Sequence, residues 1–124
     1  VCSEMRRLCE KKIAPLEILL VHGVPAGFIE YQVDTPQSDW CEKPGYGFLR
    51  EVYISAPYRK GGLGRDMVAY AEHRLQNAGA KRVYLTSDST GAFWEKCGYK
   101  ATGKTSEKNQ SPIYEKMICP LKVL

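Results

Sequence analysis

The sequence lacks any apolar run of the length that a membrane-spanning helix requires. It also lacks a Cys-x-x-Cys pair, a histidine placed to complete a zinc site, an internal repeat and a low-complexity tract. These absences argue against a membrane protein, a zinc-stabilised module and a repeat protein. What remains is a chain of 124 residues with 44% hydrophobic and 26% charged residues, which is ordinary for a globular protein. We expect residues 1–124 to form a single domain.

Charge of one sign does not dominate the sequence. The net charge is +4, but Lys and Arg are interspersed with Asp and Glu and form no long basic stripe. We therefore expect a small anionic ligand, no membrane partner, and no nucleic-acid partner. The alternative is a nucleic-acid-binding domain that uses the basic residues of segments 6–12 and 59–65. The five cysteines are odd in number, which favours reduced thiols in a cytoplasmic protein over a disulfide or metal framework.

The hydrophobic pattern predicts alternating strands and helices. Met5, Leu8, Cys9 and Ile13 fall at helical spacing before Pro15, so residues 3–12 are expected to form a short amphipathic helix. The other predicted elements are a strand hairpin at 16–21 and 27–33, a loop at 34–44, strands at 45–55 and 82–86, a helix from 62 to a stop at Gly79, a shorter helix ending at Cys97, and a final strand pair at 99–104 and 113–118.

Two local details of this prediction concern side-chain placement. The strand at 45–55 is expected to carry Phe48, Val52 and Ile54 on one side and Leu49, Glu51 and Tyr53 on the other, although a bulge would shift this alternation. Ser87, Asp88 and Ser89 are expected to cap the shorter helix. The strand, helix and strand between residues 45 and 86 form a right-handed parallel crossover.

A glycine-rich turn joins the strand at 45–55 to the long helix. It consists of Arg59, Lys60, Gly61, Gly62, Leu63 and Gly64. No Ser or Asp caps the helix, so the amides near Gly62, Gly64 and Arg65 are free to bind a phosphate, which the nearby cations would also attract. The alternative is a plain connecting turn. The turn fits neither the P-loop pattern nor the dinucleotide pattern, which would need a third glycine at Met67.

This turn resembles the pyrophosphate loop of the GNAT superfamily of acyl-CoA-dependent N-acetyltransferases, which reads Arg/Gln-x-x-Gly-x-Gly/Ala. Arg59, Gly62 and Gly64 match its three defined positions. The preceding run, Val52-Tyr53-Ile54 followed by Pro57-Tyr58-Arg59, is also similar to the family. A second family motif resembles the run Phe93-Trp94-Glu95-Lys96-Cys97-Gly98-Tyr99. Two motifs separated by one strand and one helix are more specific than either motif alone.

The resemblance implies an α+β fold of the three-layer type: a mixed, mostly antiparallel sheet with one central, splayed parallel pair and flanking helices. The two parallel strands would hold the pantetheine arm of acetyl-CoA, which pairs with the backbone of Val52, Tyr53 and Ile54. The pyrophosphate would lie against Arg59, Lys60, Gly61, Gly62, Leu63, Gly64 and Arg65. Ser87 and Lys96 are further cofactor candidates, with helix capping and solvation as their alternatives. No metal is expected.

Transfer to an amine requires a base, and Glu51 is the candidate because it lies beside the predicted thioester strand. A surface glutamate is an equal alternative, and Glu30 is a weaker candidate base. The family usually has Tyr as its acid at the position of Trp94, whose indole N–H cannot supply a proton at neutral pH. Tyr99 is expected to lie in the core. The thiolate is expected to leave without help, because a thiol is already fairly acidic.

The sequence thus predicts an N-acetyltransferase that acts on a primary amine of a small molecule or peptide. The alternative is a degenerate module that binds acyl-CoA without catalysis. The family usually begins with a further strand and helix that help to form the acceptor pocket. Their absence here implies either a fragment or a shortened fold whose missing wall comes from a partner, for example in a homodimer.

Overall fold

The computed structural model describes residues 3–9, 16–38, 40–88 and 91–118. These residues form seven strands, two α-helices and one short 3₁₀ helix. In chain order the elements are β1 (Ser3–Cys9), β2 (Leu16–Val21), β3 (Val24–Val33), β4 (Gly47–Ile54), η1 (Ala56–Tyr58), α1 (Leu63–Asn77), β5 (Arg82–Thr86), α2 (Ala92–Lys96), β6 (Lys100–Thr105) and β7 (Pro112–Met117).

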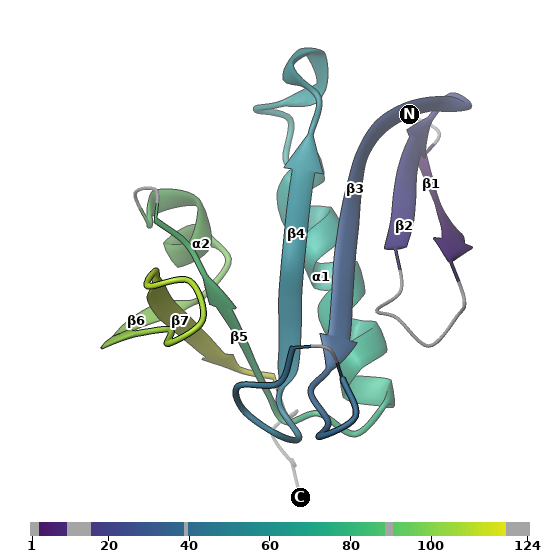
Figure 1. Cartoon of the computed structure of the whole chain (residues 1–124). Coiled ribbons are helices and arrows are strands. Elements are labelled where there is room, and N and C mark those ends of the chain that lie inside the picture. Colours follow the sequence, from purple (N-terminus) through teal and green to yellow (C-terminus); the bar gives the residue numbers. More distant parts are fainter. Residues whose placement is uncertain (1–2, 10–15, 39, 89–90, 119–124) are drawn as a thin grey trace, which may run out of the picture.

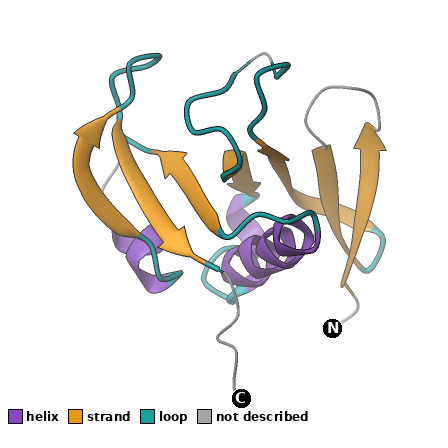
Figure 2. Cartoon of the chain, turned by 90° about the horizontal axis from the view of Figure 1, so that it is seen from below, coloured by secondary structure: helices purple, strands orange, loops and turns teal. Residues whose placement is uncertain are grey.

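All seven strands belong to one sheet with the order β1-β2-β3-β4-β5-β7-β6. Neighbouring strands are antiparallel except for the central pair, β4 and β5, which is parallel. Figure 1 shows these two strands meeting at one end and diverging towards the other. Both helices lie on the same side of the sheet (Figure 2). The predicted fold class, a mixed and mostly antiparallel sheet with a splayed parallel pair, is confirmed.

The first element corrects the sequence prediction, because Ser3–Cys9 is the edge strand β1 and not a helix. Met5 packs against the core, whereas Glu4 and Arg6 are exposed, which is the alternation of a strand. The apolar residues have helical spacing, but the segment pairs with β2 as a strand, and Met5 lies opposite Leu19. Residues 10–12 of the predicted helix lie outside the described residues.

The hairpin of β2 and β3 is confirmed, with a tighter turn than predicted. His22 and Gly23 have φ values of 51° and 79°, and these two residues alone connect the strands. Positive φ at both central positions defines the two-residue turn that matches the twist of a hairpin. As a result β3 begins at Val24 rather than at Gly27.

A bulge in β4 rearranges the faces of that strand. Glu30 of β3 pairs with Glu51, but the next residue, Tyr31, pairs with Leu49, so Arg50 is the extra residue. Leu49 therefore lies on the helix side with Val52 and Ile54, while Phe48 belongs to a separate cluster on the opposite face. The predicted grouping of Phe48 with Val52 and Ile54 is wrong for this reason.

Helix α1 packs the core against the sheet. Its buried residues are Met67, Val68, Ala71 and Leu75, and Gly79 with φ of 102° follows its end as predicted. A buried carboxylate fixes the helix to the sheet: Glu17 of β2 is 2% exposed and accepts hydrogen bonds from Tyr31 and, over 2.6 Å, from Tyr70. Burial, followed by the hydrogen bond to Glu17, raises the pKa of Tyr31.

The predicted cap of the shorter helix is wrong. Helix α2 begins after Gly91, and no side chain caps it. The amide of Ser87 instead donates to the carbonyl of Pro112 over 3.0 Å, which extends the β5–β7 ladder, and Asp88 is exposed. Ser89 lies outside the described residues. The strand at 82–86 is confirmed at its predicted bounds, and the final antiparallel pair is present as β6 and β7.

Two further properties bear on the sequence predictions. Cys41 and Cys97, whose side chains the structure describes, are free thiols. The pKa of each of these two thiols is raised, mainly by burial. Among the described helices, none combines the length and low polarity that crossing a bilayer requires.

Candidate functional site

The two central strands separate, so that one edge of β4 is unpaired along part of its length. Pairing between β4 and β5 extends over two residue pairs, Gly47 with Val83 and Phe48 with Tyr84. Beyond them β5 stays paired with β7, and β4 stays paired with β3 as far as Ile54. The strands thus separate just before the bulge, which bends β4. The β5-facing edge of β4 is suited to an extended ligand that pairs with its backbone.

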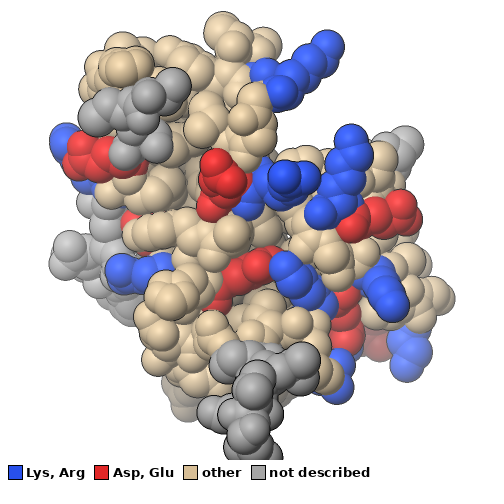
Figure 3. All heavy atoms as spheres, turned by 180° about the vertical axis from the view of Figure 1, so that it is seen from behind, with Lys and Arg blue, Asp and Glu red and all other residues tan. Residues whose placement is uncertain are grey.

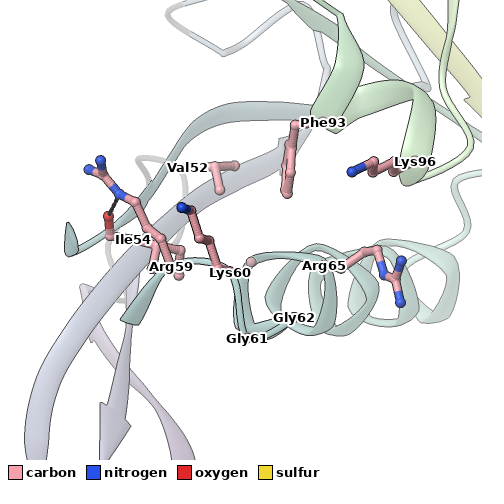
Figure 4. Close-up of a pocket in the computed structure, with 10 residues that line it drawn as sticks. Val52, Ile54, Arg59, Lys60, Gly61, Gly62, Arg65, Phe93 and Lys96 are labelled. Atoms are coloured by element: carbon pink, nitrogen blue, oxygen red, sulfur yellow. Dashed lines mark hydrogen bonds between the residues drawn. The ribbon is translucent and has the colours of Figure 1, made fainter. Parts of the chain in front are cut away.

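A cavity of about 620 Å³ adjoins this separated stretch of β4. It lies between the second half of β4, the turn before α1, and helix α2, and Figure 4 shows its lining residues. The lining consists of Val52, Ile54, Arg59, Lys60, Gly61, Gly62, Gly64, Arg65, Phe93 and Lys96. The structure therefore brings most of the predicted cofactor residues together. Phe93 is the addition, and its signal was its place in the aromatic pair of the second motif.

The N-terminus of α1 opens onto the cavity without a cap. Gly62 is the N-cap residue with φ of 85°, and no side chain hydrogen-bonds to the first turn. Lys60 also has a positive φ, 73°, which is uncommon for a residue with a side chain. The first helical hydrogen bond runs from the amide of Asp66 to the carbonyl of Gly62 over 3.0 Å. The amides before Asp66 are available to an anion, which the helix dipole favours.

The charge around the cavity has one sign. Arg59, Lys60, Arg65 and Lys96 contribute positive charges, and none of the described residues that line the cavity is acidic. Asp66 in the first turn lines a different pocket, on the β1 side of α1. Figure 3 shows a notch in the molecule's rear face with Lys and Arg side chains on both of its sides. The electrostatics of this face therefore match a polyanionic ligand.

Arg59 is already bound to the sheet. Its Nε donates to the carbonyl of Ile54 over 2.7 Å, and its guanidinium carbon lies 5.6 Å from the centroid of the Tyr53 ring. Figure 4 shows the guanidinium turned away from Phe93 and Lys96. Arg59 thus stabilises the end of β4, and its contact with an anion would require a different side-chain conformation.

The last glycine of the turn lies in close contact with helix α2. A Cβ on Gly64 would lie 3.2 Å from the Phe93 ring and 3.6 Å from Ile54. Gly62 differs, because a Cβ there would meet nothing within 4 Å and only its positive φ favours glycine. One glycine of the motif therefore lets α2 approach α1, and the other shapes the open turn.

Four of the predicted site residues lie outside the cavity lining. Tyr53 is exposed on the opposite face, where its ring stacks on Phe28, so only its backbone faces the gap. Leu63 packs against the core, and Ser87 lies in the extension of β5. Glu51 is exposed on the face opposite α1, directly across from Glu30, because the bulge precedes it. The roles of these residues stay predictions.

The second motif contributes mainly to packing. Tyr99 is 1% exposed and donates to Glu72 over 2.8 Å. Burial, followed by the charge of Glu72, raises the pKa of Tyr99 well above the ordinary tyrosine value. Tyr99 is thus a core residue, as predicted. The Trp94 ring meets Phe93 and Tyr99 edge to face and does not line the cavity. Among the described residues no group of three or more His, Cys, Asp and Glu could hold a metal ion.

Solved structures share this architecture over most of the chain. A PaiA N-acetyltransferase from Thermoplasma acidophilum, solved with coenzyme A, has a TM-score of 0.66, 18% identity and coverage of 82% of this chain and 59% of its own. YhbS from Escherichia coli, a GNAT family N-acetyltransferase solved with CoA, has a TM-score of 0.65 and 15% identity over 86% of this chain and 60% of its own. GCN5 from Tetrahymena has a TM-score of 0.70 and 12% identity, and the match covers 90% of this chain and 72% of GCN5. This chain spans less than two thirds of the first two proteins.

The sequence itself also matches a family model. The model described as the Acetyltransferase (GNAT) family matches residues 5–99, which include both motifs and the whole cavity. The match covers more than half of the chain, and it agrees with the splayed strands and the glycine turn. The chain therefore belongs to the GNAT acetyltransferase family.

Proposed function

We propose that this protein is an N-acetyltransferase that transfers the acetyl group of acetyl-CoA directly to a primary amine of a small molecule or peptide. The observation that carries the proposal is one continuous surface. The unpaired edge of β4 leads into a cavity that ends at the uncapped, cationic N-terminus of α1. An extended thioester with a polyanionic end fits a site with these two parts.

The two ends of the donor would bind different groups. The pyrophosphate would accept hydrogen bonds from amides of the turn near Gly62 and Gly64, next to the charges of Lys60 and Arg65. Lys96 on α2 would reach the phosphates from the other wall. The pantetheine arm would pair with the backbone of residues 52–54 and lie on the apolar side chains of Val52 and Ile54.

The chemistry is attack of a neutral amine on the thioester carbonyl, followed by departure of the CoA thiolate. A backbone amide of β4 would polarise the carbonyl as negative charge develops on its oxygen. Glu51 would take the amine proton, either directly or through water, from the face of the sheet opposite the cofactor. Glu30 lies across from it on β3 and is the weaker candidate. The thiolate would leave without a protein acid, because Trp94 cannot supply a proton.

The test is release of free CoA thiol from acetyl-CoA in the presence of a panel of primary amines. The proposal predicts release that depends on the acceptor, together with an acetylated product detected by mass spectrometry. A second candidate function, a non-catalytic acyl-CoA-binding module, is favoured by Trp94 at the position where the family usually has tyrosine. Acetyl-CoA that binds without acylation of any amine would reject the enzyme and support the module.

A further inference from the structure

A chain of buried and half-buried polar contacts lies at the point where β4 and β5 separate. Arg50, the extra residue of the bulge, donates through Nη1 to Gln32 Oε1 over 3.0 Å. Gln32 Nε2 donates to Asp34 Oδ1 over 2.7 Å, and Asp34 Oδ2 accepts from the hydroxyl of Tyr84 on β5. We call Arg50, Gln32, Asp34 and Tyr84 the apex network. It links the bulge of β4 to β5 by way of β3.

Three of the four members of the apex network, Gln32, Asp34 and Tyr84, are buried, and Arg50 is half-buried. Asp34 is 1% exposed and Tyr84 is 0% exposed. The amide of Gln32 has one orientation only, because its nitrogen also donates to the carbonyl of Trp40 over 2.7 Å and its oxygen accepts from Arg50. Asp34 Oδ2 further accepts from the amides of Glu42 and Lys43, at 2.9 and 3.0 Å. Buried groups with this many partners hold one geometry.

The network lies at the last pair of the parallel strands, Phe48 of β4 and Tyr84 of β5. Tyr84 pairs with Phe48 in the backbone, and their rings stack with centroids 4.5 Å apart and 5° between planes. Phe48 in turn pairs with Gln32 on β3. The aromatic pair therefore holds the strands together on one side of the joint, and Arg50 holds the bulge immediately after it. The side chains of the network and the aromatic pair thus contact both strands where they part.

We propose that the apex network sets the separation of β4 and β5, and thereby positions the thioester end of the bound donor. Its four members are positioning residues: they hold the β4 backbone that would pair with the pantetheine arm. The pyrophosphate end lies at the N-terminus of α1, away from the joint, and does not depend on the network. This inference rests on the proposed acetyl-CoA site.

The test compares two hydroxyl deletions that are matched in chemistry. Tyr84→Phe removes one donor from buried Asp34 at the joint, whereas the control Tyr70→Phe removes one donor from buried Glu17 at the other end of the sheet. Gln32→Met is a second test variant, because it keeps the side-chain length and breaks the link to Arg50. Thermal melts establish that each variant is folded. Calorimetry then measures binding of acetyl-CoA and of adenosine 3′-phosphate 5′-diphosphate, which keeps the pyrophosphate and lacks the pantetheine arm.

We expect Tyr84→Phe and Gln32→Met to weaken acetyl-CoA binding about tenfold, because small displacements of a positioning group are costly, and to lower kcat at saturating substrates by a further factor of about ten. In every variant the affinity for the pantetheine-free nucleotide should stay within about twofold of the wild-type value. The control Tyr70→Phe should also keep its affinity for acetyl-CoA within about twofold of wild type. Folded test variants that retain acetyl-CoA affinity and kcat would overturn the inference, as would equal weakening of both ligands.

The wild-type protein separates this inference from the proposed function. Wild-type protein that binds acetyl-CoA but acetylates no amine rejects the enzyme, and the binding comparison still decides the role of the network. Wild-type protein that binds neither ligand overturns the donor site and the inference together.

Discussion

A carboxylate at Gly62 should reduce donor affinity by more than a neutral side chain that places the same strain on the backbone there. Gly62 occupies the N-cap position of α1 with φ of 85°, and a Cβ there would meet no atom within 4 Å, so a side chain has room. The variant is Gly62→Asp, and its matched control is Gly62→Asn, which has the same shape and no charge. Asp and Asn are the side chains that best tolerate this backbone region. The pair therefore isolates charge from strain.

The magnitude follows from the distance between the added charge and the ligand. A pyrophosphate held by the first-turn amides would place a phosphate charge about 5 Å from the new carboxylate, which costs about 1 kcal/mol in a water-like medium and about 3 kcal/mol at an effective dielectric constant near 20. The expected loss of acetyl-CoA affinity, Asp relative to Asn, is therefore roughly 5- to 150-fold. The Asp variant should nevertheless melt at or above the Asn variant, because a negative charge at a helix N-terminus stabilises the helix by about 0.3–1 kcal/mol.

Isothermal titration calorimetry with acetyl-CoA at low and high salt is the assay. The Asp penalty should shrink at about 1 M salt, where the screening length is only about 3 Å. If the two variants bind acetyl-CoA with the same affinity at low salt, the pyrophosphate does not lie at this turn and the assignment of the site is refuted.

Three further predictions concern catalysis and stability. Glu51→Gln should lower kcat/KM about 100-fold at neutral pH, the contribution typical of a general base, with recovery as rising pH deprotonates the amine. An equal loss in Glu30→Gln would contradict this assignment. Trp94→Tyr should leave kcat within about threefold, whereas a rise of tenfold or more would identify a missing general acid. Because the pKa of Tyr99 is raised on folding, the folded state keeps a proton that the unfolded chain loses above pH about 10. Stability should then fall by up to about 1.4 kcal/mol per pH unit above that value, and denaturant unfolding at pH 9 to 11 should find a shallower decline in Tyr99→Phe.

The features that could be predicted from the sequence are those that a few consecutive residues determine. The glycine turn is such a feature, because an uncapped helix start and a positive φ at Gly62 are properties of a few consecutive residues. The strand Arg82–Thr86 and the stop at Gly79 are others. For these features the local backbone preference and the final structure agree.

The errors arose where distant parts of the chain decide the outcome. The segment at Ser3–Cys9 has apolar spacing that fits a helix, yet pairing with β2 makes it a strand. The extra residue Arg50 moves Leu49 to the helix side, and no local pattern locates a bulge whose partner lies on β3. The contact of Arg59 with Tyr53 likewise requires the folded end of β4. Family resemblance predicts a function for the turn, but it could not predict these contacts.

The short joint between β4 and β5 has a consequence for the order of folding. Strands β1 to β4 pair with their neighbours along the sequence, whereas β4 and β5 are separated in the sequence by η1 and α1. Contacts between distant segments carry the larger loop-closure cost, so we expect the joint to form after the transition state of folding. Tyr84→Phe should then accelerate unfolding and leave the folding rate nearly unchanged, with a φ-value near zero, whereas a φ-value near one would place the joint in the folding nucleus.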